Sequence, residues 1–111
     1  MGKELSDAAR ELELYMNNDG TLYRQNIEPI HKNLEKKIAK GTFSLPLSVK
    51  LWSYAVEAAA KKYVKEFGGT WNKIFPKADR DIVAHREAIH FALNHDIYVS
   101  EHDQKAVFLY D

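Results

Sequence analysis

Lysines at helical spacing are the residues in this sequence best placed to do chemistry. Lys32, Lys36 and Lys40 recur at every fourth position, with Lys37 and Arg24 close by. On a helix, this spacing puts the ammonium groups on one face, at a repulsive cost of about 0.3 kcal/mol per pair. Such a row can hold phosphates or receive an acidic protein surface, and an ordinary solvated face is a third interpretation.

A later run of lysines extends the row if the polar faces of two helices adjoin. Because lysine outnumbers arginine here, diffuse charge matching is favoured over bidentate reading of nucleic-acid bases. Amphipathic tyrosine rings outside the core can serve as binding anchors. We therefore expect a binding surface made of basic and tyrosine side chains: Arg24, Lys32, Lys36, Lys37, Lys40, Lys61, Lys62, Lys65, Tyr23 and Tyr54.

Charge is segregated along a chain whose formal net charge is zero. Residues 21–67 contain nine Lys or Arg against four acidic residues, a net of +5. The first twenty residues have a net charge of −3, and residues 68–111 of −2. The pattern predicts a folded surface with a basic side and an acidic side.

Histidines are the candidate metal ligands, and their spacing is unfavourable. His85, His90 and His95 follow one another at intervals of five, so each is turned about 140° from the previous one on a helix. A site that combines His95, His102 and Asp103 stays open. Structural, hydrogen-bonded histidines are the favoured interpretation, and we expect neither a metal nor a cofactor.

Catalytic signatures are missing from the sequence. It has no cysteine, which excludes thiol nucleophiles and thiolate metal sites. It also has no nucleophile elbow, no phosphate-binding glycine loop and no carboxylate pair on an apolar face. We expect a non-enzymatic protein.

Helical periodicity accounts for most of the chain. The second predicted helix contains Pro29, which predicts a kink or a break there. A single helical turn is expected at 70–75, before Pro76 restarts the chain. Capping residues and apolar spacing predict four main helices, at 6–16, 21–41, 46–67 and 76–95.

The carboxy-terminal segment has a different composition. Residues 97–100 and 106–110 are β-branched and aromatic, which favours a short β-hairpin or an extended tail. Among the aromatic residues, core packing is the expected role of Trp52, Tyr63, Phe67 and Phe91. The fold class expected is mainly α: one compact four-helix domain over residues 1–111, with a kinked second helix.

Size and composition fit one globular domain. The chain has 111 residues, of which 45% are hydrophobic and 29% charged. No apolar run approaches the roughly 20 residues that a membrane-spanning helix needs, and Met1–Glu4 lack the apolar stretch of a signal peptide. We expect a location in the cytoplasm and no membrane partner.

The middle of the chain contains a series of short motifs between residues 22 and 84. They are Leu22-Tyr23-Arg24, Pro29, Lys32-Asn33-Leu34, Lys36-Lys37, Gly41-Thr42, Lys50-Leu51, Ala59-Ala60-Lys61-Lys62-Tyr63, Glu66-Phe67-Gly68, Phe75-Pro76, Arg80 and Val83-Ala84. In these motifs the chain resembles a group of small uncharacterised proteins encoded by bacteriophages and other mobile elements. The likeness includes no catalytic signature. It implies synthesis in an infected bacterial cytoplasm, where accessory proteins bind host machinery.

Together these observations favour a small phage-type accessory protein that binds a host or phage partner through a basic helical face. A protein partner is preferred, and sequence-independent nucleic-acid binding through the same lysines is the alternative.

Overall fold

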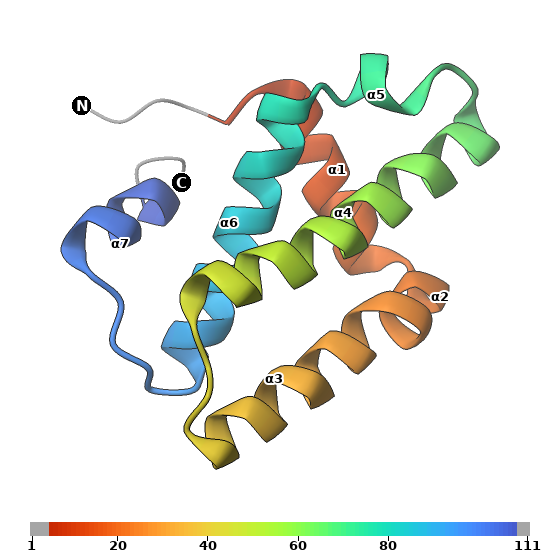
Figure 1. Ribbon diagram of the computed structural model, residues 1–111. Coiled ribbons are helices and arrows are strands. Elements are labelled where there is room, and N and C mark those ends of the chain that lie inside the picture. The colour runs from red at the N-terminus through yellow and green to blue at the C-terminus, as the bar shows by residue number, and fades with distance from the viewer. Residues whose placement is uncertain (1–4, 109–111) are drawn as a thin grey trace.

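A computed structural model describes residues 5–108 of the chain, and this part is mainly helical (Figure 1). The helices are α1 (Asp7–Asn18), α2 (Gly20–Leu22), the π-helical turn η1 (Tyr23–Ile27), α3 (Glu28–Lys40), α4 (Leu45–Phe67), α5 (Trp71–Ile74), α6 (Lys77–Asn94) and α7 (Glu101–Phe108). Because α2, η1 and α3 follow one another without a break, the described residues form six helices, not the four expected.

Capping side chains explain where the main helices begin. The hydroxyl oxygen of Ser6 accepts a hydrogen bond from the Ala9 N–H at 3.1 Å, and that of Ser44 accepts one from Leu47 at 3.3 Å. The second helix was expected to begin at Thr21, but its cap is Asp19, whose carboxylate accepts from Leu22 at 2.9 Å. Gly41 ends α3 in the left-handed conformation, with φ of 73°.

Pro29 explains the π-turn in the second helix. Proline has no N–H to donate, and its ring clashes with the carbonyl four residues earlier in a regular α-helix. The chain widens into η1 just before this point, and the Glu28 N–H donates to the carbonyl of Tyr23, five residues back. The helix therefore continues through the proline instead of stopping at it.

The core lies where α4 crosses the other helices. α4 packs most extensively against α6, and α1 contacts both (Figure 1). Trp52, Val56, Ala59 and Ala60 on α4 are all buried, and small side chains such as alanine allow helices to pack closely. α7 contacts α6, and the segment that joins the two helices adds the buried Val99, which belongs to the same apolar cluster as Ile89 and Ala92 of α6.

The expected β-hairpin is wrong, because residues 101–108 form α7 and no strand occurs between residues 5 and 108. Ser100 accepts a hydrogen bond from the Asp103 N–H at 3.2 Å, and Glu101 and Asp103 lie in the first turn of α7. These helix-start signals outweigh the β-propensity of the residues that follow, since an isolated two-stranded hairpin is only marginally stable. Residues 109–110 of the expected second strand lie outside the described residues.

Candidate functional site

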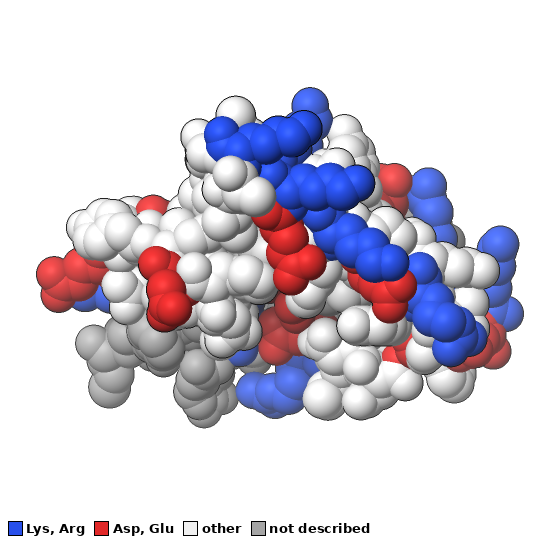
Figure 2. All heavy atoms as spheres, turned by 90° about the horizontal axis from the view of Figure 1, so that it is seen from below, with Lys and Arg blue, Asp and Glu red and all other residues white. Residues whose placement is uncertain are grey.

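The lysine row on α3 is one cationic feature of the predicted site, with Lys36 and Lys40 exposed and Lys37 half-buried. Figure 2 shows blue side chains in a diagonal row on the face that α3 exposes, with red carboxylates beside them. Lys32 pairs with Glu28 at 3.2 Å. Lys36, Lys37 and Lys40 have no ion pair within residues 5–108. These three, hereafter the α3 lysines, lie within two turns of one helix and gather uncompensated positive charge there.

Two of the α3 lysines interact favourably with the end of their own helix. Lys37 and Lys40 lie in the last turn of α3. There the partial negative charge of the helix end stabilises a cation by about 0.3–1 kcal/mol. This interaction offsets part of the repulsion between neighbouring ammonium groups.

Tyr23 and Arg24 lie at the far end of the same continuous helix. Both are in η1, and the Tyr23 side chain is 47% exposed. Arg24 is exposed, with no ion pair among the described residues. Thirteen residues separate Arg24 from Lys37, or roughly 20 Å along a helix. Tyr23 and Arg24 are therefore too far from the α3 lysines to form one cluster with them, although they lie on the same continuous helix.

The lysines of α4 face a different surface, a groove between α4 and the start of the second helix. Lys61, Lys62 and Lys65 line this groove of about 330 Å³, opposite Gln25 and Asn26. Lys61 pairs with Glu57 at 3.5 Å, and its Nζ lies 5.0 Å from the centre of the Trp71 ring. Lys65 is exposed and has no ion pair in the described part of the chain.

Lys62 is committed to contacts inside the molecule. Its Nζ lies 2.7 Å from an Asp19 carboxylate oxygen and 3.4 Å from both Glu66 Oε1 and the Tyr15 hydroxyl. The hydrogen bond to Asp19 raises the pKa of Lys62 and lowers the pKa of Asp19. Burial is the main cause of the raised pKa of Tyr15, and its hydrogen bond to Glu66 adds to it. The network fixes the corner between α1 and α2 against α4.

Tyr54 is the remaining predicted anchor and lies on the outer side of α4. Its side chain is 58% exposed. It is four residues from Lys50 and seven from Lys61, so the three share one helix face. The ten predicted residues therefore do not form one cluster. They divide among α3, the η1 end of the same helix, the α4 groove and, for Tyr54, the exposed side of α4.

Three histidines meet in a cavity that the sequence did not predict. His31, His90 and His95 line a space of about 260 Å³, together with Trp52 and Phe91. The His95 ring stacks on Phe91, and its Nε2 lies 3.3 Å from a Glu35 carboxylate oxygen. Burial lowers the pKa of His31, whose ring packs edge-on against Trp52. His31 was overlooked, although Ile27 four residues before it and Leu34 three after it give it core spacing.

The metal site left open by the sequence does not form in the described residues. His95 contacts Glu35, while the Asp103 carboxylate accepts a hydrogen bond from the Ser100 hydroxyl at 2.9 Å. Between residues 5 and 108, no group of three or more His, Asp or Glu side chains could hold a metal ion. His31 and His95 instead pack against aromatic rings, and His95 also makes hydrogen-bond contacts with Phe91 and Glu35.

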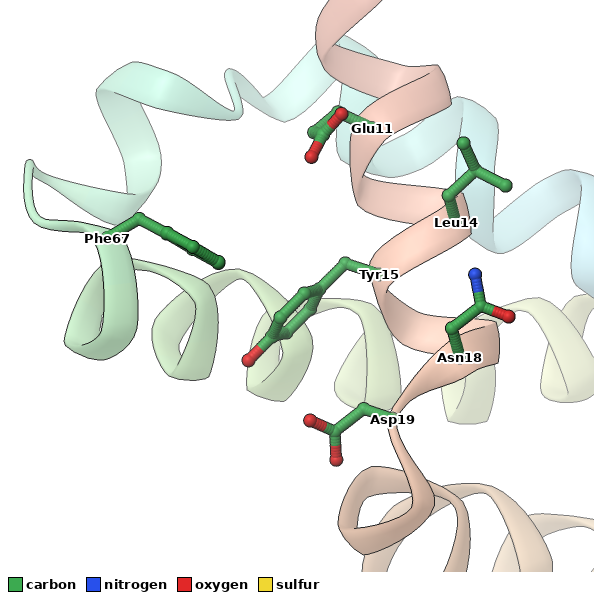
Figure 3. A pocket seen from close by; sticks show the side chains of 6 residues that line it. All are labelled: Glu11, Leu14, Tyr15, Asn18, Asp19 and Phe67. Carbon is green, nitrogen blue, oxygen red and sulfur yellow. The ribbon is translucent and has the colours of Figure 1, made fainter.

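A second groove, also missed from the sequence, lies between α1 and the end of α4 (Figure 3). It has a volume of about 280 Å³ and is lined by Glu11, Leu14, Tyr15, Asn18, Asp19 and Phe67. Phe67 was expected in the core, and this is wrong because its side chain is 66% exposed. The helix ends at Phe67, so nothing further along α4 covers the ring. Trp52 and Phe91 are buried as expected.

Comparisons with protein-family models, with curated proteins and with solved structures gave no match. The resemblance to phage-encoded proteins therefore stays a prediction. No helix among residues 5–108 is long and apolar enough to cross a bilayer.

Proposed function

We propose that this protein is a non-enzymatic, phage-type accessory protein that binds an acidic surface of a host or phage protein in the bacterial cytoplasm. The observation that carries the proposal is the cluster of exposed Lys36 and Lys40 and half-buried Lys37, which lie on one helix without a carboxylate partner in the described residues. Their fields add at short range and steer an acidic partner toward α3. Tyr23, at the other end of the same continuous helix, and Lys65 and Tyr54, on α4, are further contacts for a partner large enough to reach beyond α3.

The carboxylates on the same helix favour a protein over a nucleic acid. Glu28 pairs with Lys32, and Glu35 lies beside Lys36 in the sequence and contacts His95. A phosphate backbone presents negative charge along its whole length and meets these carboxylates unfavourably. A protein surface can place a basic or neutral group opposite each one. Sequence-independent nucleic-acid binding is the second candidate, because the same lysines can neutralise phosphates.

The test compares two variants with equal net charge. One replaces the α3 lysines, Lys36/Lys37/Lys40→Gln. The control, Lys50/Lys73/Lys105→Gln, removes three exposed lysines on other helices that also have no ion pair in the described part of the chain. Fluorescence anisotropy then measures binding of a polyglutamate peptide and of a DNA duplex to each protein at low and moderate salt.

We expect the α3 variant to bind polyglutamate about tenfold more weakly than wild type, since three exposed charge contacts contribute roughly 0.2–1 kcal/mol each. The control should bind nearly as wild type does. Tight DNA binding with a steep salt dependence would favour the nucleic-acid candidate instead. Equal losses in the two variants would show that only net charge matters, which contradicts a site on α3.

Affinity capture from a bacterial lysate extends the test to natural partners. A protein retained by wild type and by the Lys50/Lys73/Lys105→Gln control, but released by the α3 variant, is the expected result. A protein retained equally by all three would place the contact elsewhere on the molecule.

A further inference from the structure

The groove between α1 and the end of α4 combines exposed apolar side chains with an acidic rim. Leu14 is 55% exposed and Phe67 is 66% exposed, which is unusual for side chains of this size. In Figure 3 Phe67 and Tyr15 extend from two different helices toward the same opening, with Glu11 and Asp19 above and below it. Exposed apolar side chains rimmed by polar groups are typical of surfaces that contact another molecule.

Phe67 is held in place although it is exposed. Its ring centre lies 4.7 Å from that of Tyr63 and 6.3 Å from that of Tyr15, which contacts it edge-on. The Tyr15 hydroxyl donates a hydrogen bond to Glu66 at 3.0 Å. Because the supporting rings already fix the position of Phe67, a ligand that covers it loses little side-chain entropy.

The charges around the groove select the kind of ligand. Glu11 is exposed and has no ion pair within residues 5–108. Asp19 lines the groove and Glu66 adjoins it, and both carboxylates share the single ammonium group of Lys62. Three carboxylates against one cation leave a negative rim, which attracts lysine or arginine and repels acidic groups.

We propose that this groove docks a short basic segment of a partner protein that presents an apolar side chain between Leu14 and Phe67 and a cation toward Glu11. A helical segment with Leu and Lys three or four positions apart, and therefore on one face, meets both requirements. A second copy of this chain fits less well. Its own lysine row lies on α3, and α3 has no large exposed hydrophobic side chain to enter the groove. The site is distinct from the α3 lysines and has the opposite charge preference.

The experiment uses two synthetic helical peptides with leucines at identical positions, one with Lys and one with Glu at the remaining exposed positions. Each is titrated into the ¹⁵N-labelled full-length protein at moderate salt and followed by amide chemical shifts. The lysine peptide should bind with a Kd below 1 mM, and the largest shifts should fall on Leu14, Tyr15 and Phe67. Absence of binding, comparable binding of the glutamate peptide or shifts centred on other residues would overturn the proposal.

Two variants and two controls test the apolar and the acidic parts separately. Phe67→Ser should weaken lysine-peptide binding at least tenfold, and Glu11→Lys several-fold with a reduced salt dependence. Tyr98→Ser and Glu101→Lys alter exposed residues outside the groove and should leave the Kd unchanged. If circular dichroism shows that Phe67→Ser is unfolded, Leu14→Ser replaces it with the same expected loss.

Sedimentation equilibrium of wild type and Phe67→Ser distinguishes a partner segment from a second copy. A monomer in both samples is the expected result. Self-association of the wild type that Phe67→Ser abolishes would mean that another copy occupies the groove, and the proposal of a basic partner segment would then be wrong.

Discussion

Cations of the same type have opposite roles in two regions of this molecule. On α3, Lys36, Lys37 and Lys40 have no ion pair in the described part of the chain. At the corner between α1, α2 and α4, Lys62 contacts two carboxylates and a phenol, and its side chain is only 31% exposed. The first set is available to a partner, and the second is already used by the fold.

Arg86 is the extreme case of a cation used by the fold. Its side chain is 7% exposed, and its Nε lies 3.0 Å from a carboxylate oxygen of Glu13 on α1. The pair joins the two helices at the edge of the core. The difference from α3 shows that a lysine or arginine count measures charge but not availability, because availability depends on which carboxylates the fold brings near.

Replacing Arg86 with methionine should give the largest effect on stability. Arg86→Met leaves the partly buried Glu13 carboxylate without its cation, and loss of one partner of a buried pair costs about 3 kcal/mol. Urea denaturation measures the change in the free energy of unfolding. Arg24→Met is the matched control, since Arg24 is exposed and has no ion pair among the described residues, and it should change stability by less than about 0.5 kcal/mol. Similar losses in both would remove the distinction between the two sets of cations.

The helices were predictable because their signals are local. Ser6, Ser44 and Gly41 mark helix ends through hydrogen bonds within three or four residues, and the sequence shows each of them. The predicted hairpin is wrong because two local signals compete in this segment. The local start signal at Ser100 competes with β-branched residues, and no neighbouring strand is present between residues 5 and 108 to decide in favour of a sheet.

The site was only partly predictable because its contacts are not local. Lys62 and Asp19 are separated by 43 positions, and their contact depends on how α1 turns into α2. Phe67 has the spacing of a core residue, yet it is the last residue of α4 and its side chain is 66% exposed. Lysine spacing on one helix predicted the α3 lysines, but no sequence pattern could show that Lys62 is committed elsewhere.

Replacing Lys62 should give the second largest loss of stability. Lys62→Met removes the cation that Asp19, Glu66 and the Tyr15 hydroxyl share, so the thermal midpoint should fall, though by less than in Arg86→Met. Lys65→Met, three residues further along the same helix, is the control. Lys65 has no ion pair in the described residues, and its midpoint should stay near that of wild type. An unchanged thermal midpoint in Lys62→Met would mean that the contacts of Lys62 do not stabilise the fold, so that Lys62 would not differ from the α3 lysines.

Removal of the α3 lysines should have a smaller effect on folding than on binding. In Lys36/Lys37/Lys40→Gln, the loss of favourable charge at the end of α3 is partly offset by relief of like-charge repulsion. The free energy of unfolding should therefore stay within about 1 kcal/mol of wild type, as denaturant titration can measure. A larger loss would mean that these lysines also stabilise the fold, and the contrast with Lys62 would disappear.

The smallest effect expected is a change in acid sensitivity at the Lys62 corner. The hydrogen bond from Lys62 is the main cause that lowers the pKa of Asp19 from its ordinary value of 3.8. A carboxyl whose pKa is lower in the folded state than in the unfolded state stabilises the fold at pH values above its unfolded pKa. This contribution is lost as the pH falls through the folded pKa. The wild type should therefore lose stability below about pH 3.8 more steeply than Lys62→Met, in which Asp19 has lost this partner. Denaturation midpoints between pH 5 and pH 2.5 measure the two slopes.

Lys65→Met again provides the control for this acid sensitivity, because its substitution removes one positive charge from the same helix and leaves the contact between Lys62 and Asp19 intact. Its slope should match that of the wild type. If Lys65→Met and Lys62→Met flattened the slope equally, the acid response would follow from net charge alone. The ion pair at the corner would then be no more specific than the exposed charges on α3, and the two regions would differ in burial but not in electrostatic function.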